Sequence, residues 1–361
     1  MFLRDKKEQL IPAWIRRTGP EGGVVLSSRI RLARNLKDIP FPHYAGEKAL
    51  EEILSLVEKT VSPEQVSVAA ADTDQNDLQK LRLVRLDSLG SLERMVLVEK
   101  HLVSPNLVNH PAHRGVLLNQ QETLSIMINE EDHIRIQTIT PGLQLEAAWD
   151  MANQTDDFLE ASLDYAFDEH RGFLTSCPTN VGTGLRASVM VHLPGLVLVD
   201  QAKKVLSALP QVGLNVRGIY GEGTESMGNL FQISNQVTLG HSEEDLIGNL
   251  LSLTKQVTDQ EKSVREALLK ESKLQMENRV HRAYGILTQA RLISSEEAMK
   301  LLSDVWLGIE CGLIPDLQAE TVKELIPLIR VSILQQLIGR ELGAEERDYY
   351  RAAVIREQLL G

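Results

Sequence analysis

The stretch Asn129-Glu130-Glu131-Asp132-His133-Ile134-Arg135 decides how the middle of this 361-residue chain folds. On either side of it, residues 122–128 and 133–139 alternate between apolar and polar side chains, as half-buried strands do. The first four residues of the stretch are polar and suit a turn. The sequence therefore predicts a β-hairpin with its turn at Asn129–Asp132.

The second strand of this hairpin has two different faces. Successive side chains of a strand point to opposite sides, so Ile134 and Ile136 share one face. His133, Arg135 and Gln137 share the other. Arg135 would then project away from the core, where a ligand could lie on the sheet.

The periodicity of the rest of the chain favours an α+β fold. Strands near 187–193, 212–218 and 230–239, with helices between them, favour an antiparallel β-sheet flanked by helices. From Ser242 onward glycine becomes rare and the patterns are helical. Helices are predicted at 47–60, 91–99, 143–170, 242–272, 277–291, 294–309, 321–338 and 344–360. We expect three parts with a boundary near 255–265: an N-terminal segment over 1–23, a sheet domain over 24–258 and an all-α C-terminal domain over 259–361.

Composition excludes several classes of protein. A formal charge of −12 argues against general affinity for nucleic acid or anionic membranes. Cys177 and Cys311 are the only cysteines, too few for a secreted disulfide scaffold. The charged N-terminus leaves no room for the apolar core of a signal peptide, and no apolar run approaches membrane-spanning length. We expect a cytoplasmic protein with no membrane contact and no direct contact with nucleic acid.

Arginines recur in blocks that suit an anionic ligand. Arg29 and Arg31 share one face if their segment is extended, and their repulsion then needs an anion or carboxylates; a pair of ordinary surface arginines is an equally good interpretation. The loop Cys177–Leu185 is rich in Gly, Thr and Asn and precedes Arg186, so its backbone N–H groups could approach a phosphate. It lacks the Walker A pattern, and taken alone it could be a plain turn. Several arginine forks together suit a polyphosphate.

Acidic residues and a cysteine accompany these arginines. Glu131 and Glu225 are candidates to hold a cation and remove a proton, although each alone would be interpreted as solvated. Cys177 could be a small buried hydrophobe or a thiolate stabilised by nearby arginines.

Four blocks of the sequence together resemble the ATP:guanido phosphotransferase (phosphagen kinase) family over about residues 24–250. They are Ser27–Arg34, Asn129–Arg135, Cys177–Arg186 and Arg217–Glu225. The segments Asn129–Arg135 and Cys177-Pro178-Thr179-Asn180 are the most diagnostic. The resemblance implies Mg-ATP as cosubstrate, bound by arginines on an antiparallel sheet. It implies a nucleotide site formed by Ser27, Ser28, Arg29, Ile30, Arg31, His101, Arg135, Arg186, Ala187, Ser188, Val189, Met190, Arg217, Gly218, Ile219, Tyr220, Gly221 and Glu222.

The same resemblance implies roles for the remaining residues of the site. Glu131 and Glu225 match the two carboxylates that embrace the guanidinium, and Cys177 matches the family's reactive cysteine. Glu130 matches a contact to Mg²⁺ through water. Small-guanidine kinases place an arginine where this chain has Tyr220, and Arg217 is our candidate replacement.

A second departure concerns the acceptor. Small-guanidine kinases carry a helical domain of roughly a hundred residues before the first arginine block, and only 26 residues precede Ser27 here. This shortening and the helical C-terminal domain are similar to bacterial family members that phosphorylate arginine side chains of proteins. The implied partners are arginine-bearing substrates (a heat-shock repressor and misfolded proteins), a zinc-binding activator protein, the Clp ATPase/protease and a second copy in a homodimer. Two alternatives remain open: a kinase for free arginine, and a phosphoarginine-binding adaptor without turnover.

The last predicted helix begins with a further arginine motif. Arg347 and Arg351 are i, i+4 neighbours that repel unless something negative lies between them. Asp348 could pair with a guanidinium. Sequence alone favours an ordinary charged helix face, whereas the family resemblance implies a regulatory phosphoarginine pocket made of Arg347, Asp348, Arg351 and Ala352.

Overall fold

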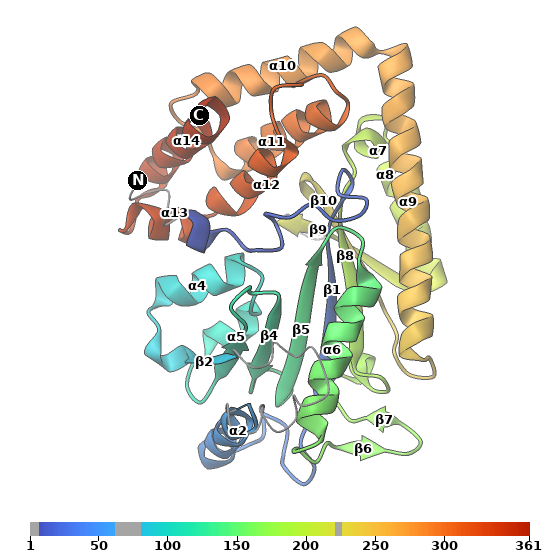
Figure 1. The fold of residues 1–361 in the computed structure, drawn as a ribbon, viewed down its shortest axis with the longest axis vertical. Helices are drawn as coiled ribbons and strands as arrows, with labels where there is room; N and C mark the ends of the chain where they lie inside the picture. The colour runs from blue at the N-terminus through green and yellow to red at the C-terminus, as the bar shows by residue number, and fades with distance from the viewer. Residues whose placement is uncertain (1–6, 62–80, 221–225) are drawn as a thin grey trace.

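The computed structural model describes residues 7–61, 81–220 and 226–361. Its centre is a sheet in the order β2-β3-β4-β5-β1-β8-β10-β9, in which every described pairing is antiparallel (Figure 1). The strands are β1 Val25–Arg34, β2 Arg82–Arg85, β3 Gly115–Leu118, β4 Leu124–Ile128, β5 Ile134–Pro141, β8 Leu185–His192, β9 Leu214–Tyr220 and β10 Ser226–Asn235. A separate ribbon pairs β6 Phe167–Asp168 with β7 Gly172–Phe173.

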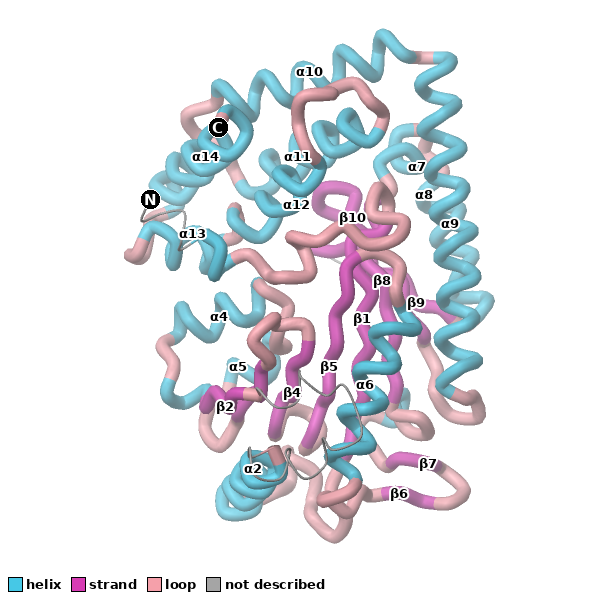
Figure 2. Tube along the Cα trace, viewed as in Figure 1, coloured by secondary structure: helices cyan, strands magenta, loops and turns pink. Residues whose placement is uncertain are grey.

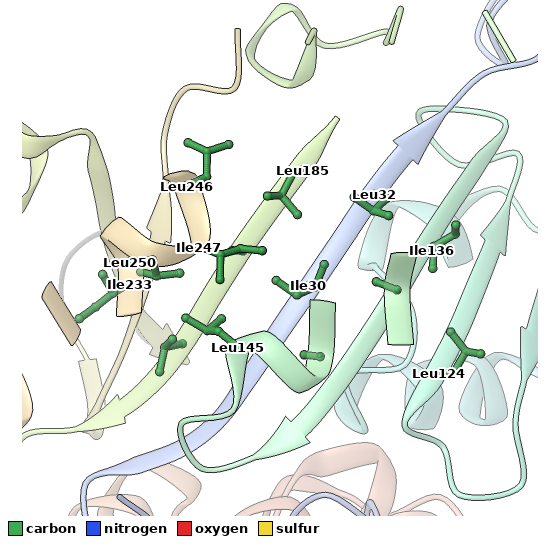
Figure 3. Packing of buried hydrophobic residues seen from close by; sticks show 14 of the residues in the cluster. Ile30, Leu32, Leu124, Ile136, Leu145, Leu185, Ile233, Leu246, Ile247 and Leu250 are labelled. Atoms are coloured by element: carbon green, nitrogen blue, oxygen red, sulfur yellow. The ribbon is translucent and has the colours of Figure 1, made fainter. Parts of the chain in front are cut away.

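One face of the sheet is covered by two long helices, α6 Leu145–Glu160 and α9 Glu243–Glu271. Alternate strand residues such as Ile30 and Ile136 are fully buried beneath them. Leu145 of α6 and Leu250 of α9 pack onto this layer (Figure 3). The apolar side chains of each strand therefore pack into the core. The side chains that alternate with them point to the opposite face of the sheet.

Shorter helices flank the sheet. They are α2 Glu47–Thr60, α4 Ser91–Glu99, α5 Pro105–Asn109, α7 Pro194–Leu198 and α8 Ala202–Ala208, with 3-10 turns at Leu86–Ser88, Pro178–Asn180 and Leu209–Val212. Figure 2 shows that helix replaces strand in the C-terminal part. The helices there are α10 Lys273–Gln289, α11 Ser295–Glu310, α12 Ala319–Leu328, α13 Val331–Ile338 and α14 Ala344–Leu360.

The C-terminal helices enclose a second core that includes the N-terminal segment. Leu10, Ile11, Trp14 and Ile15 are buried in the same cluster as residues of α10–α14. The two ends of the chain therefore pack together beside the sheet (Figure 1). Among the described residues, no helix combines the length and the apolar character needed to cross a membrane.

The predicted α+β architecture is confirmed, including the hairpin around Asn129–Asp132. Two helix predictions were wrong in extent. The helix expected over 143–170 ends at Glu160, because the chain then turns to form the β6–β7 ribbon, where the Phe167 and Phe173 rings lie 5.2 Å apart. The helix expected over 321–338 is two helices, because Arg330 is extended and the Glu99 carboxylate accepts the backbone N–H groups of Ser332 and Ile333.

The expected domain boundary at 258 falls inside α9, which continues unbroken to Glu271. The chain then bends at Ser272, whose φ of −139° and ψ of 34° lie outside the helical range. Within the N-terminal segment expected over 1–23, Leu10, Ile11, Trp14 and Ile15 pack with the helical part of the chain.

Candidate active site

Arginine side chains gather on the sheet face opposite α6 and α9. Arg31 of β1 lies beside Arg186 of β8, and Ala33 lies beside Arg135 of β5. Arg217 of β9 lies beside Gln232 of β10. Because these positions alternate with core residues, each strand sends its charged side chain to the same side.

These side chains line a pocket of about 380 Å³. Its volume lies within the range of small-molecule sites. The wall also holds an acidic residue, the cysteine and the Gly/Thr/Asn loop. The lining residues are Arg29, Arg31, Ala33, Glu131, Arg135, Cys177, Thr179, Asn180, Gly184, Arg186, Arg217, Gly218 and Gln232.

The positive charge of this pocket is only partly neutralised by the protein. Burial, followed by the charges of Arg29, Arg135 and Arg186, lowers the pKa of Arg31 well below its usual value. Burial and the charge of Arg217 lower the pKa of Arg186. Both shifts mean that the protonated guanidinium is disfavoured here, so an anion in the pocket would relieve repulsion.

The Asn129–Arg135 motif divides into residues that build the turn and one that faces the pocket. Asp132 is fully buried and accepts hydrogen bonds from Asn35 and from the backbone N–H of Ser176, both at 2.7 Å. Asn129 donates to two backbone carbonyls, and both ring nitrogens of buried His133 are engaged. The side chain of Glu131 is 40% exposed and lines the pocket. Glu131 is therefore the residue of the turn with a carboxylate available to a ligand.

Arg135 positions the two glutamates of the turn. Its guanidinium lies 2.5 Å from Glu130, 2.9 Å from Glu131 and 4.0 Å from Asp132. Glu130 is buried, and its other oxygen accepts a hydrogen bond from Ser104 at 2.5 Å. Arg135 thus fixes the orientation of Glu131 while contributing its own charge to the pocket.

Cys177 lies on the same wall as Glu131. Its sulfur is 3.0 Å from the hydroxyl of Thr179. The neighbouring Ser176 donates its hydroxyl hydrogen to the backbone carbonyl of Glu131 at 2.8 Å. A hydrogen bond therefore joins the loop that carries Cys177 to the turn that carries Glu131.

A narrower cleft adjoins the arginine pocket, and Arg29 and Gln232 line both. Gln232 accepts a hydrogen bond from Arg29 at 2.8 Å, and Ser188 accepts one at 3.3 Å. Burial and the charges of Arg29 and Arg330 lower the pKa of His101 to about 3, so its ring is neutral at physiological pH. The cleft is lined by Trp14, Ser27, Arg29, His101, Ile139, Ser188, Met190 and Gln232.

Sequence reasoning missed Gln232 and Trp14. A signal existed for Gln232, because it alternates with the buried Phe231 and Ile233 on a strand beside the arginine block. No signal existed for Trp14, which reaches the cleft from a segment outside the sheet.

Several residues predicted for the nucleotide site point elsewhere. The side chains of Ile30, Ala187 and Val189 are fully buried in the core on the other face. Ser28 is buried; it donates to the carbonyl of Gly142 and accepts from the N–H of Gln144. These residues support the site from behind, and only their backbone could face a ligand. The predicted Gly221, Glu222 and Glu225, and the side chains of Ile219 and Tyr220, lie outside what the structure describes.

The described residues include no group of three or more His, Cys, Asp or Glu side chains placed to hold a metal ion. Both oxygens of Glu130 already contact Ser104 or Arg135. Because Mg²⁺ usually keeps several waters and binds largely through substrate phosphates, a Mg²⁺ site here would not need such a group.

The arginine motif on α14 has a different geometry. Arg351 is 2% exposed and donates to the backbone carbonyls of Ile329 and Ile293, at 3.1 and 2.9 Å. It also lies 2.5 Å from Asp348. Arg347 donates to the carbonyl of Leu342, and Ala352 is buried.

An antiparallel sheet that presents clustered arginines beside a carboxylate and a cysteine defines a class of phosphotransferase. Residues 63–264 match the family described as ATP:guanido phosphotransferase, C-terminal catalytic domain. The chain belongs to this family. Residues 273–361 match the protein-arginine kinase McsB C-terminal domain.

Relatives that match over the full length of the chain place it within one branch of this family. A protein-arginine kinase of Halothermothrix orenii is 51% identical over 359 residues, which cover 99% of each chain. That of Bacillus subtilis is 49% identical over 360 residues, covering 99% of this chain and 96% of its own. The chain is thus a member of the protein-arginine kinase branch.

Solved structures share the fold. The crystal structure of lombricine kinase has a TM-score of 0.56 at 25% identity, covering 72% of this chain and 71% of its own. The duplicated taurocyamine kinase from Schistosoma mansoni, with bound transition state analog components, has a TM-score of 0.57 at 25% identity. That match covers 78% of this chain and 40% of the other.

Proposed function

We propose that this chain transfers the γ-phosphoryl group of ATP to arginine side chains of proteins. The observation that supports this most directly is the pocket in which Arg29, Arg31, Arg135 and Arg186 face Glu131 and Cys177. The arginines suit the triphosphate, and the acid suits a guanidinium acceptor. The names of the full-length relatives support a protein as the source of that acceptor.

The acceptor nitrogen must lose a proton before or during attack. A guanidinium has a pKa of about 13, and about six pKa units at about 1.36 kcal/mol each make the neutral form cost about 8 kcal/mol at pH 7. Glu131 is the proposed base, and Glu225, outside the described residues, is its proposed partner in orienting the guanidinium. As the N–P bond forms, the bond from the γ-phosphorus to the bridging oxygen breaks, ADP leaves and the proton passes to Glu131.

The arginines act mainly on charge. Arg29, Arg31, Arg135 and Arg186 would neutralise the transferring group and its leaving oxygen, the main electrostatic task in phosphoryl transfer. Arg217, on the same pocket wall, is proposed to replace the arginine that other family members have at the position of Tyr220. Holding donor and acceptor in line lowers the barrier further.

Two further groups belong to the proposal. Mg²⁺ would supply charge neutralisation to the phosphates, with Glu130 holding one of its waters. Cys177, beside Thr179, would contact the acceptor guanidinium. We keep Gly218 in the nucleotide site because it lines the pocket.

The biological setting is proposed from the family resemblance. Phosphoarginine would mark proteins for Clp-type degradation and regulate a stress response through a heat-shock repressor. A zinc-binding activator protein would be a further partner, the helical domain would support a homodimer, and the setting would be the cytoplasm. Phosphoarginine would bind at Arg347, Asp348, Arg351 and Ala352, provided that the guanidinium competes with Arg351 for Asp348.

The test is phosphorylation of a basic protein by Mg-ATP, with the product detected by mass spectrometry under non-acidic conditions because phosphoramidates are acid-labile. Glu131→Ala should abolish the product and leave the fold intact, since this half-exposed side chain makes one ion pair and Arg135 keeps Glu130. Near-normal activity of this variant would show that the base is another residue.

Controls separate the alternative functions. Turnover with free arginine and none with proteins would identify a small-guanidine kinase. Tight binding of phosphoarginine peptides without turnover by the wild-type chain would identify an adaptor.

A further inference from the structure

We propose that Trp14 contacts the base of the bound nucleotide and makes the N-terminal segment part of the nucleotide site. This inference deepens the proposed function and rests on it. Trp14 lines the narrow cleft that adjoins the arginine pocket, and Arg29 and Gln232 line both spaces. A ligand with an anionic tail on the arginines and a body extending past Arg29 therefore reaches Trp14.

The walls of the cleft suit a flat, weakly polar group. Ile139 and Met190 are almost fully buried apolar side chains, and His101 and Trp14 add two aromatic rings. The rings lie 6.0 Å apart at an angle of 65°. Because burial and the arginines keep His101 neutral at physiological pH, this end of the ligand meets no charged ring. A nucleobase has the aromatic face that such walls bind.

Trp14 also carries an unused hydrogen-bond donor. Its side chain is 2% exposed, and among the described residues its Nε1 has no hydrogen-bond partner. The indole nitrogen can only donate, and a buried tryptophan N–H usually finds an acceptor. A ring nitrogen or a carbonyl oxygen of a base, or a ribose oxygen, would be such an acceptor.

Contacts on both sides hold Trp14 in place. Its neighbours Ile11 and Ile15 are buried in the C-terminal helical core. Lys100 donates to the backbone carbonyl of Gln9 at 2.9 Å and pairs with Glu122. Lys100 immediately precedes His101, so the two aromatic walls of the cleft are joined through one buried lysine. Trp14 is therefore a fixed wall of the cleft, whose free volume of about 10 Å³ must widen when a base enters.

The experiment compares ATP with inorganic tripolyphosphate, which has the anionic tail and no base. Trp14→Leu removes the ring, and Trp14→Phe keeps an aromatic face and removes the N–H. We expect the KM for ATP to rise about tenfold in Trp14→Leu and about threefold in Trp14→Phe, as loss of one base contact predicts. Inhibition by tripolyphosphate, the KM for the protein acceptor and kcat should change less than twofold, because the arginine pocket is intact.

Tryptophan fluorescence gives a second readout that needs no turnover. The chain has three tryptophans, of which Trp149 lies on α6 against the opposite face of the sheet. We expect ADP to quench the fluorescence of the wild type and of Trp149→Phe, and quenching to be lost in Trp14→Phe. If Trp14→Leu does not fold, Trp14→Phe still decides the matter.

Other results would overturn the inference. An unchanged KM for ATP in both variants, or quenching that persists in Trp14→Phe, would mean that the base lies elsewhere. An equal loss of ATP and tripolyphosphate binding would mean that Trp14 supports the arginines instead. In these cases the activity loss of Glu131→Ala would still support the proposed function, whereas a wild type that binds ADP through Trp14 without any turnover would contradict that function alone.

Discussion

The arginine pocket on the sheet and the arginine motif on α14 use the same side chains in opposite ways. In the pocket, Arg31 faces Arg29, Arg135 and Arg186, and its pKa is lowered by burial and by their charges. On α14, Arg351 is buried more completely, and two backbone carbonyls and Asp348 satisfy its guanidinium. In the pocket an anion would relieve the repulsion between the arginines, whereas on α14 a ligand would have to displace partners that Arg351 already has.

The largest expected effect that tests this difference is a loss of activity on substitution of Arg31. Arg34, three residues further along β1, provides the comparison. Arg31→Met should lower kcat/KM by at least about 100-fold, because it removes a donor that we propose acts on the transferring group. The charged form of Arg31 is disfavoured in the folded state, so the free energy of unfolding should stay the same or rise. Steady-state kinetics and urea denaturation measure the two quantities.

Arg34→Met is the matched control. Arg34 is 2% exposed and donates to Asp156 at 2.6 Å and to the carbonyls of Ala33 and Thr183. Breaking this buried pair should lower the free energy of unfolding by about 3 kcal/mol. Should Arg31→Met prove as destabilising as Arg34→Met, the charge of the pocket would be structural rather than reserved for a ligand.

On α14 the expected effect is on stability. Arg351→Met should lower the free energy of unfolding by about 3 kcal/mol, because it leaves Asp348 and two buried carbonyls without their donor. Arg347→Met, which removes one hydrogen bond to Leu342, should cost about 1 kcal/mol or less. Urea denaturation of both variants tests this. Equal stability of Arg351→Met and the wild type would instead place Arg351 with the pocket arginines, as a side chain held for a ligand.

The sequence predicted the arginine pocket better than its surroundings, because side chains in a strand alternate between the two faces of the sheet. Arg29 and Arg31 alternate with Ile30 and Leu32, so the face that carries the arginines follows from the apolar residues between them. The same period shows that Ile30, which the family resemblance assigns to the nucleotide site, points into the core.

What the sequence could not predict depends on contacts between distant segments. Trp14 meets His101 in space, and no local pattern brings them together. The end of α6 at Glu160 depends on the ribbon formed by Phe167 and Phe173, although the helical pattern itself continues to 170. Likewise, the sequence places Arg351 beside Arg347 as a repelling pair, and it does not show that the carbonyls of Ile329 and Ile293 accept hydrogen bonds from Arg351.

His101 provides the last prediction, an effect on stability that appears only at low pH. Its pKa is lowered to about 3 by burial, by Arg29 of the pocket and by Arg330 beside α13. Above pH 6.5 the ring is neutral in both the folded and the unfolded chain and contributes no pH dependence. As the pH falls below 6.5 the unfolded chain binds a proton that the folded chain does not, so stability is lost; at pH 5 the loss from this residue is about 2 kcal/mol.

His101→Asn should remove this part of the stability loss, because asparagine tolerates the positive φ of 62° at this position and cannot be protonated. Urea denaturation at pH 7.5 and pH 5 measures the difference between the variant and the wild type, and identical losses of stability in the two would show that the pKa of His101 is not lowered in the folded chain.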